Sequence, residues 1–166
     1  WDTGAIGFMT MACRTLREAT EALGQFYNLL NDGYTLHGHA DDQHFLIGMV
    51  PMGPIHSPRL EKLTLAVISW HARWLSKRAD LVFDAHFSFP QPAPEQVRML
   101  QRTFGGQVRF GHHESCLMGP AEYAAYPVAK GPNSDSVLDM LRTQLMAEMA
   151  TLHESSSHFM HKVERI

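Results

Sequence analysis

The sequence is short of cysteine and of long apolar runs. Among its 166 residues there are two cysteines, Cys13 and Cys116, and their separation fits neither a metal-binding nor a redox motif. Such usage is typical of a chain kept in a reducing, cytoplasmic compartment. No apolar run approaches the roughly 20 residues of a membrane span, and no signal peptide is visible. The sequence therefore predicts neither membrane insertion nor secretion.

Positive charge and catalytic motifs are also scarce. Fourteen Lys and Arg against 17 Asp and Glu give a net charge of −3, and the cations are scattered. We therefore expect this chain alone to bind nucleic acid poorly. Ser88, Ser115 and the cysteines lack the setting of a nucleophile elbow or a papain-like thiol, and no glycine-rich phosphate loop is present. The sequence favours neither an enzyme nor a cofactor-binding protein.

What the chain does contain suffices for one domain. A chain of this length can bury roughly 70% of its unfolded surface without disulfides or metals. The strongest break is Gly131-Pro132-Asn133-Ser134. We therefore predict a domain over 1–131 and a C-terminal helical segment over 132–166. Because the chain opens with Trp1 rather than Met, we expect it to be a piece of a longer protein.

The most strongly patterned stretch is a predicted helix over 58–77. Ser57 suits its N-cap and Pro58 its first position, since proline has no N–H to lose. Apolar residues recur there at three- and four-residue spacing: Leu60, Leu63, Val67, Trp70 and Trp74. We interpret it as the central helix, with its two tryptophans forming one wall of the core.

The remaining patterns predict an α+β fold. Thr15 and Glu18 form a capping box that opens a helix over 15–31, and a shorter helix is expected over 95–104. Segments 34–39 and 44–50 alternate as a hairpin, in which we pair His39 with His44 and Leu36 with Ile47. Segment 81–89 is the clearest strand. The sequence thus predicts an antiparallel sheet of about four strands against several helices, preceded by a buried, glycine-containing apolar segment over 1–12.

Two segments carry motifs in a familiar order. In 4–30, a glycine-rich apolar stretch precedes Thr15-Leu16 at a helix start. In 82–111, a strand ending in Pro-x-Pro leads into a helix and then Phe-Gly-x-x-Val-x-Phe, here Phe104 to Phe110. This order resembles the N-terminal, arabinose-binding-like sensor domain of AraC/XylS-type transcription regulators.

The resemblance implies a function in regulation. In that family the domain senses a small effector, and a pair of helix-turn-helix units that contacts DNA follows it. Segment 132–166 would then lead towards the DNA-binding part, which lies outside this chain. The resemblance leaves open which effector is bound, whether it activates or represses, and which promoter is served.

An aromatic cluster is the predicted effector site. On the helical pattern, Trp70 and Trp74 should meet Phe83 and Phe87, so that indoles and phenyl rings enclose a hollow. A mostly apolar cavity with few polar groups is the usual form of a small-molecule site. The predicted effector-binding residues are Tyr27, Trp70, His71, Trp74, Phe83 and Phe87. The alternative is that the same rings form solid core.

Histidines on the hairpin raise a second possibility. His37, His39 and His44 share one face, and His86 joins them if the strands are neighbours, so a metal-dependent enzyme or metal sensor is an alternative function. No carboxylate or cysteine completes a recognisable ligand set, which favours a solvent-facing surface and no metal. His112-His113-Glu114 is predicted to be a turn, because adjacent strand residues point to opposite faces.

The C-terminal helix carries an apolar stripe that must be covered. Its members are Leu138, Leu141, Leu145, Met149 and Leu152. The stripe can pack on its own domain or against a second copy as a short coiled-coil seam. A homodimer is therefore possible, and a pure dimerisation module without a ligand is a third alternative function.

Overall fold

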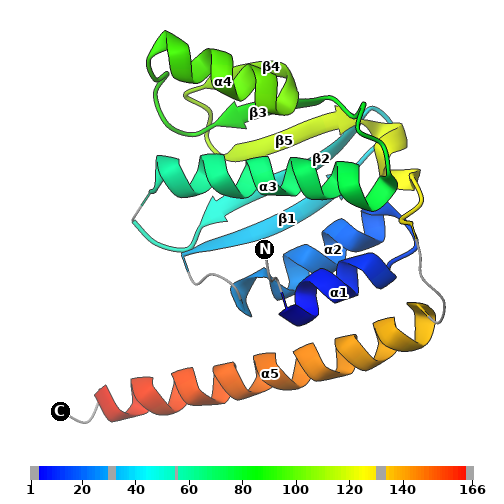
Figure 1. Cartoon of the computed structure of the whole chain (residues 1–166). Helices are drawn as coiled ribbons and strands as arrows, with labels where there is room; N and C mark the ends of the chain where they lie inside the picture. The colour runs from blue at the N-terminus through cyan, green and yellow to red at the C-terminus, as the bar shows by residue number, and fades with distance from the viewer. Residues whose placement is uncertain (1–3, 30–32, 55, 130–133, 164–166) are drawn as a thin grey trace.

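The computed structural model describes residues 4–29, 33–54, 56–129 and 134–163, with side chains undescribed at 4, 5, 134 and 152–163. Figure 1 shows its elements, which in chain order are α1 (Gly4–Ala12), α2 (Leu16–Phe26), η1 (Tyr27–Leu29), β1 (Tyr34–Ala40), β2 (His44–Pro51), α3 (Pro58–Ser76), β3 (Phe83–Phe87), α4 (Pro94–Phe104), β4 (Gly105–Phe110), β5 (Ser115–Pro120), η2 (Ala121–Ala125) and α5 (Ser134–Val163). The α+β class is as predicted.

The strands form a five-stranded mixed sheet with the order β1-β2-β5-β3-β4. Neighbours pair antiparallel except β3 and β4, which are parallel. The prediction of about four antiparallel strands was therefore wrong in number and in one orientation. The reason is α4, which carries the chain from the end of β3 back to its start, so that β4 runs in the same direction.

The hairpin has the predicted faces but a different register. Leu36 pairs with Met49, and His39 pairs with Leu46 rather than with His44. The difference is two residues, and a shift of two leaves every side chain on its original face. The turn sets the register, because the Asp41 carboxylate accepts hydrogen bonds from the backbone N–H groups of Gln43 and His44 at 2.8 and 2.7 Å.

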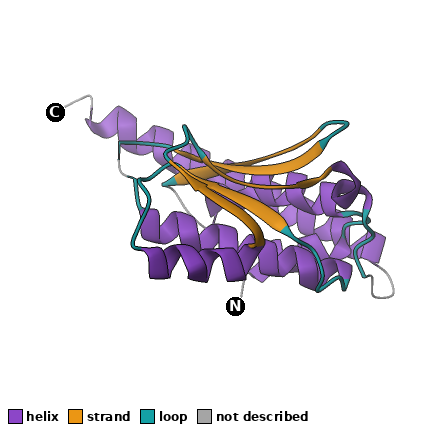
Figure 2. Cartoon of the chain, turned by 90° about the horizontal axis from the view of Figure 1, so that it is seen from above, coloured by secondary structure: helices purple, strands orange, loops and turns teal. Residues whose placement is uncertain are grey.

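The helices lie mainly to one side of the sheet (Figure 2). α3 crosses its face, α2 packs against β1, and α1 lies between α2 and α5. Of the apolar segment predicted over 1–12, residues 4–12 form the helix α1, in which Ile6, Met9 and Ala12 are buried as expected, and residues 1–3 lie outside the described part of the chain. The glycines of α1 are tolerated because Ile6 and Met9 are buried against neighbouring helices, and packing outweighs intrinsic propensity.

The apolar stripe of α5 is covered by the rest of the same chain. Leu138, Leu141 and Leu145 are buried in the main core cluster, and α5 contacts α1. Met149 packs at the edge of that cluster, whereas the side chain of Leu152 lies outside the described residues. Of the two arrangements open from the sequence, the structure shows packing on the chain's own domain for these three leucines.

None of the helices within the described ranges is both long and apolar enough to cross a membrane.

Candidate functional site

The two tryptophans of α3 lie at the surface, not in the core. The exposed fractions of Trp70 and Trp74 are 56% and 49%. The face of α3 that meets the sheet carries other residues at the same helical spacing: Glu61, Thr64, Leu65, Ile68, Ser69, Ala72 and Leu75. The expectation that both indoles form a wall of the core was therefore wrong.

The phenyl rings expected beside the tryptophans lie elsewhere. Phe83 and Phe87 are 1% and 0% exposed. The ring of Phe87 lies against those of Phe89, Phe104 and Phe110, with centroids 4.9 to 6.0 Å apart. These phenyl rings fill the interior, so the structure does not place them around a hollow with the indoles.

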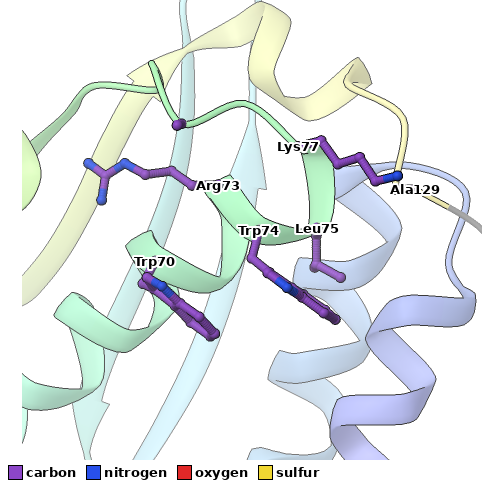
Figure 3. A pocket seen from close by; sticks show the side chains of 7 residues that line it. Trp70, Arg73, Trp74, Leu75, Lys77 and Ala129 are labelled. Atoms are coloured by element: carbon purple, nitrogen blue, oxygen red, sulfur yellow. The ribbon is translucent and has the colours of Figure 1, made fainter.

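A cavity of about 490 Å³ nevertheless lies beside both tryptophans (Figure 3). Its lining comes from the last turns of α3 and from two later segments: Trp70, Arg73, Trp74, Leu75, Lys77, Ala79 and Ala129. The indoles of Trp70 and Trp74 are nearly parallel, at 14° with centroids 6.3 Å apart. Both rings border this space.

The end of α3 shapes the rim of the cavity. Lys77 ends the helix in the left-handed conformation, with φ of 53°, which turns the chain sharply. Next to it, the backbone N–H of Ala129 donates to the carbonyl of Leu75 at 2.8 Å. The N–H of Val128 donates to the backbone carbonyl of Arg14 at 3.0 Å. Segment 128–129 is therefore tied both to α3 and to the residues just before α2.

Arg73 anchors this end of α3 to the rest of the fold. Its guanidinium donates to the carbonyls of Leu81, Thr103 and Phe104 at 2.9 to 3.2 Å, and it lies over the ring of Phe83 at 5.6 Å. Burial lowers the pKa of Arg73, but the group stays cationic. Its positive charge thus meets neutral acceptors, and it forms no ion pair among the described residues.

His71 and Tyr27 were predicted to bind the effector, but neither of them lines the cavity. The Thr10 hydroxyl donates to the Gly7 carbonyl at 2.8 Å, so it accepts from Nε2–H of His71, also at 2.8 Å. The His71 ring stacks on Trp74, with centroids 5.8 Å apart. The buried Tyr27 hydroxyl instead contacts Thr64, on the sheet-facing side of α3. Of the predicted site residues, only Trp70 and Trp74 line the cavity.

The comparisons with known proteins agree with this fold. Residues 2–128 match the family described as the N-terminal arabinose-binding domain of AraC transcription regulators. The chain belongs to this family. No curated protein sequence matches it significantly.

The solved structures that are similar to this AraC-family domain include a transcription regulator. It is the transcriptional regulator CdpR from Pseudomonas aeruginosa, with a TM-score of 0.55 and 17% identity, over 89% of this chain and 50% of that one. At this identity the likeness shows a common fold alone. The chain spans about half the length of CdpR.

His71 should make the stability of the AraC-family domain depend on pH. Burial lowers its pKa in the folded state, whereas an unfolded histidine has a pKa of about 6.5. Below that value His71 is protonated in the unfolded chain but remains largely neutral in the folded chain. The free energy of unfolding therefore falls as pH falls. We expect the loss between about pH 7.5 and about pH 5.5 to be larger in the wild type than in His71→Gln, by about 1 kcal/mol at most. Urea unfolding at both pH values measures it, and equal losses would contradict it.

The cavity residues that the sequence did not reveal are Arg73, Leu75, Lys77, Ala79 and Ala129. From the sequence alone, Lys77 is only a cation that complements the end of a helix. Ala129 carries no local signal, because a backbone hydrogen bond to a distant residue brings it there.

A buried carboxylate was also missed. Glu61 is 1% exposed, and it accepts hydrogen bonds from the hydroxyls of Tyr34 at 3.0 Å, Ser88 at 2.8 Å and Ser115. These partners come from β1, the segment after β3, and β5. Glu61 thus joins α3 to three parts of the sheet and does not line the cavity.

The four histidines that the sequence singled out, His37, His39, His44 and His86, lie in three separate groups in the AraC-family domain. Nε2 of His37 lies 3.0 Å from the Glu114 carboxylate, while His39 and His44 lie 3.9 and 4.0 Å from Asp41. His86 stacks on His112 and is separated from the hairpin by β5. In the part of the chain that the structure describes, no group of three ligating side chains is placed to hold a metal ion. His112, His113 and Glu114 lie in the connection between β4 and β5.

Proposed function

We propose that this chain is the effector-sensing domain of a cytoplasmic AraC-type transcription regulator. A small organic molecule binds in the cavity beside Trp70 and Trp74 and controls DNA binding by an appended helix-turn-helix domain. The observation that carries the proposal is the cavity itself. Its volume of about 490 Å³ falls in the range of small-molecule sites, roughly 300–1,000 Å³.

The exposure of the indoles supports this location. Burial of either ring would remove a large apolar surface from water and would be favourable. Both rings nevertheless stay about half exposed on α3. Contiguous exposed apolar surface on a folded domain marks binding sites. A ligand that stacks on these rings would cover them, so binding, rather than catalysis or metal chemistry, is the proposed role.

The rim of the cavity provides a path to the C-terminal helix. Ala129 lines the cavity and is tied to Leu75, and the chain then continues towards α5. α5 also packs on α1, which His71 links to α3 through Thr10. A ligand that binds better to one placement of these parts shifts the population towards it. In this way occupancy of the cavity reaches the DNA-binding part.

The test is a thermal-shift screen of small molecules against the 166-residue chain and two variants. Trp74→Ala removes part of the cavity wall. Leu63→Ala is the matched control, because Leu63 is 54% exposed on the same helix but does not line the cavity. A ligand at 100 times its Kd stabilises the folded state by about 2.7 kcal/mol.

We expect effectors to raise the Tm of the wild type and of Leu63→Ala but not of Trp74→Ala. Compounds that raise all three Tm values equally bind elsewhere. If every hit behaved in that way, the cavity would not be the effector site.

A further inference from the structure

We infer that the cavity beside Trp70 and Trp74 selects a planar aromatic molecule that carries a carboxylate. This inference rests on the proposed function, because it names the chemical class of the effector for the same site. It is drawn from the charges, the hydrogen-bonding capacity and the ring geometry of the lining.

The charge of the lining has one sign. Arg73 and Lys77 are cationic, and none of the lining residues is acidic. Lys77 forms no ion pair among the described residues, and its side chain extends towards Ala129 at the rim (Figure 3). The nearby carboxylate of Asp80 is held by Arg78 at 2.8 Å. The ammonium of Lys77 is therefore free to bind an anionic group.

The lining is poor in hydrogen-bond acceptors. It contains no Asp, Glu, Asn, Gln, Ser or Thr side chain. Three of the last backbone carbonyls of α3 already accept hydrogen bonds: Arg73 accepts from Arg78, Trp74 from Lys77, and Leu75 from Ala129. A molecule with many hydroxyl groups, such as a sugar, would leave its O–H donors without partners, which is costly on desolvation. A carboxylate needs donors only.

The end of a helix ordinarily repels anions, because its carbonyl groups carry partial negative charge. Here three of those carbonyls are paired, and two cations lie at the same end of α3. The net field in the cavity is therefore favourable to a negative charge.

The indoles indicate that the uncharged part of the ligand is aromatic. Their rings are nearly parallel and about half exposed, and an aromatic ring stacks on an indole more favourably than a flexible chain does. An aromatic carboxylate places its ring on these indoles and its charge near Lys77.

The experiment compares 2-naphthoate with 2-naphthamide, which have the same ring and similar shape but differ in charge. Titration calorimetry with the wild type should give binding of the carboxylate at least about tenfold tighter than of the amide. In Lys77→Gln that preference should disappear while the amide affinity is unchanged. Arg59→Gln, which makes the same charge change on α3 outside the cavity, should keep the preference.

Equal affinities of the two probes for the wild type, or binding of neither, would overturn the inference. A preference that persists in Lys77→Gln would overturn it as well. The proposed function is decided separately, by whether hits of any chemical class in the thermal-shift screen lose their effect in Trp74→Ala.

Discussion

Phe87→Ala is expected to lower the free energy of unfolding by about 3–5 kcal/mol, whereas Trp74→Ala should lower it by about 1 kcal/mol or less. The phenyl ring of Phe87 is fully buried and touches three other phenyl rings. Its removal leaves a cavity in close-packed surroundings as well as losing burial. The Trp74 indole is about half exposed, so its loss leaves no enclosed void.

Urea unfolding followed by far-ultraviolet circular dichroism measures both values without relying on tryptophan emission. Leu63→Ala serves as a control for removal of an exposed apolar side chain from α3. Similar large losses for Phe87→Ala and Trp74→Ala would mean that the indole is part of the core after all.

Glu61→Ala is expected to lower the free energy of unfolding by at least about 3 kcal/mol. The substitution takes away the common acceptor of the hydroxyls of Tyr34, Ser88 and Ser115. Each buried hydroxyl left without a partner costs about 1–3 kcal/mol. The empty volume left by the side chain adds to the loss.

Two controls separate the hydrogen bonds from other effects of Glu61→Ala. Glu61→Gln keeps the volume and one acceptor oxygen, so its loss in urea unfolding at pH 7 should be smaller. Glu95→Ala removes an exposed carboxylate from the first turn of α4 and should cost no more than about 1 kcal/mol. A loss for Glu61→Ala as small as that for Glu95→Ala would show that the buried network contributes little.

Local patterns were sufficient for much of the fold. The N-cap of α3 at Ser57 and that of α2 at Thr15 are as the sequence indicates. The inward face of the hairpin is also as predicted, since alternation depends on the strand alone. The parallel pairing of β3 with β4 was missed because a short helix between strands does not itself specify which edge the next strand joins.

The site was located only in part, and α3 shows why. Its sheet-facing side carries Glu61, Thr64 and Ser69 among its apolar residues. Glu61 and Thr64 look unsuitable for burial until their partners from β1, β5 and η1 are in place, so hydrophobicity alone favours the face with Trp70 and Trp74. The Ser69 hydroxyl donates to the Ala66 carbonyl within α3. Residues far apart in the chain decide which face is buried, and no periodic pattern contains that information.

The hydrogen bond from Ala129 to Leu75 has a consequence for how effectors would be distinguished. It ties the Ala129 edge of the cavity directly to α3 at a distance of 2.8 Å. A molecule that fits inside the cavity would leave this hydrogen bond intact. A molecule that is a few atoms larger would push Ala129 away from Leu75 and break it. Agonists and antagonists of such a sensor would then differ in bulk rather than in functional groups.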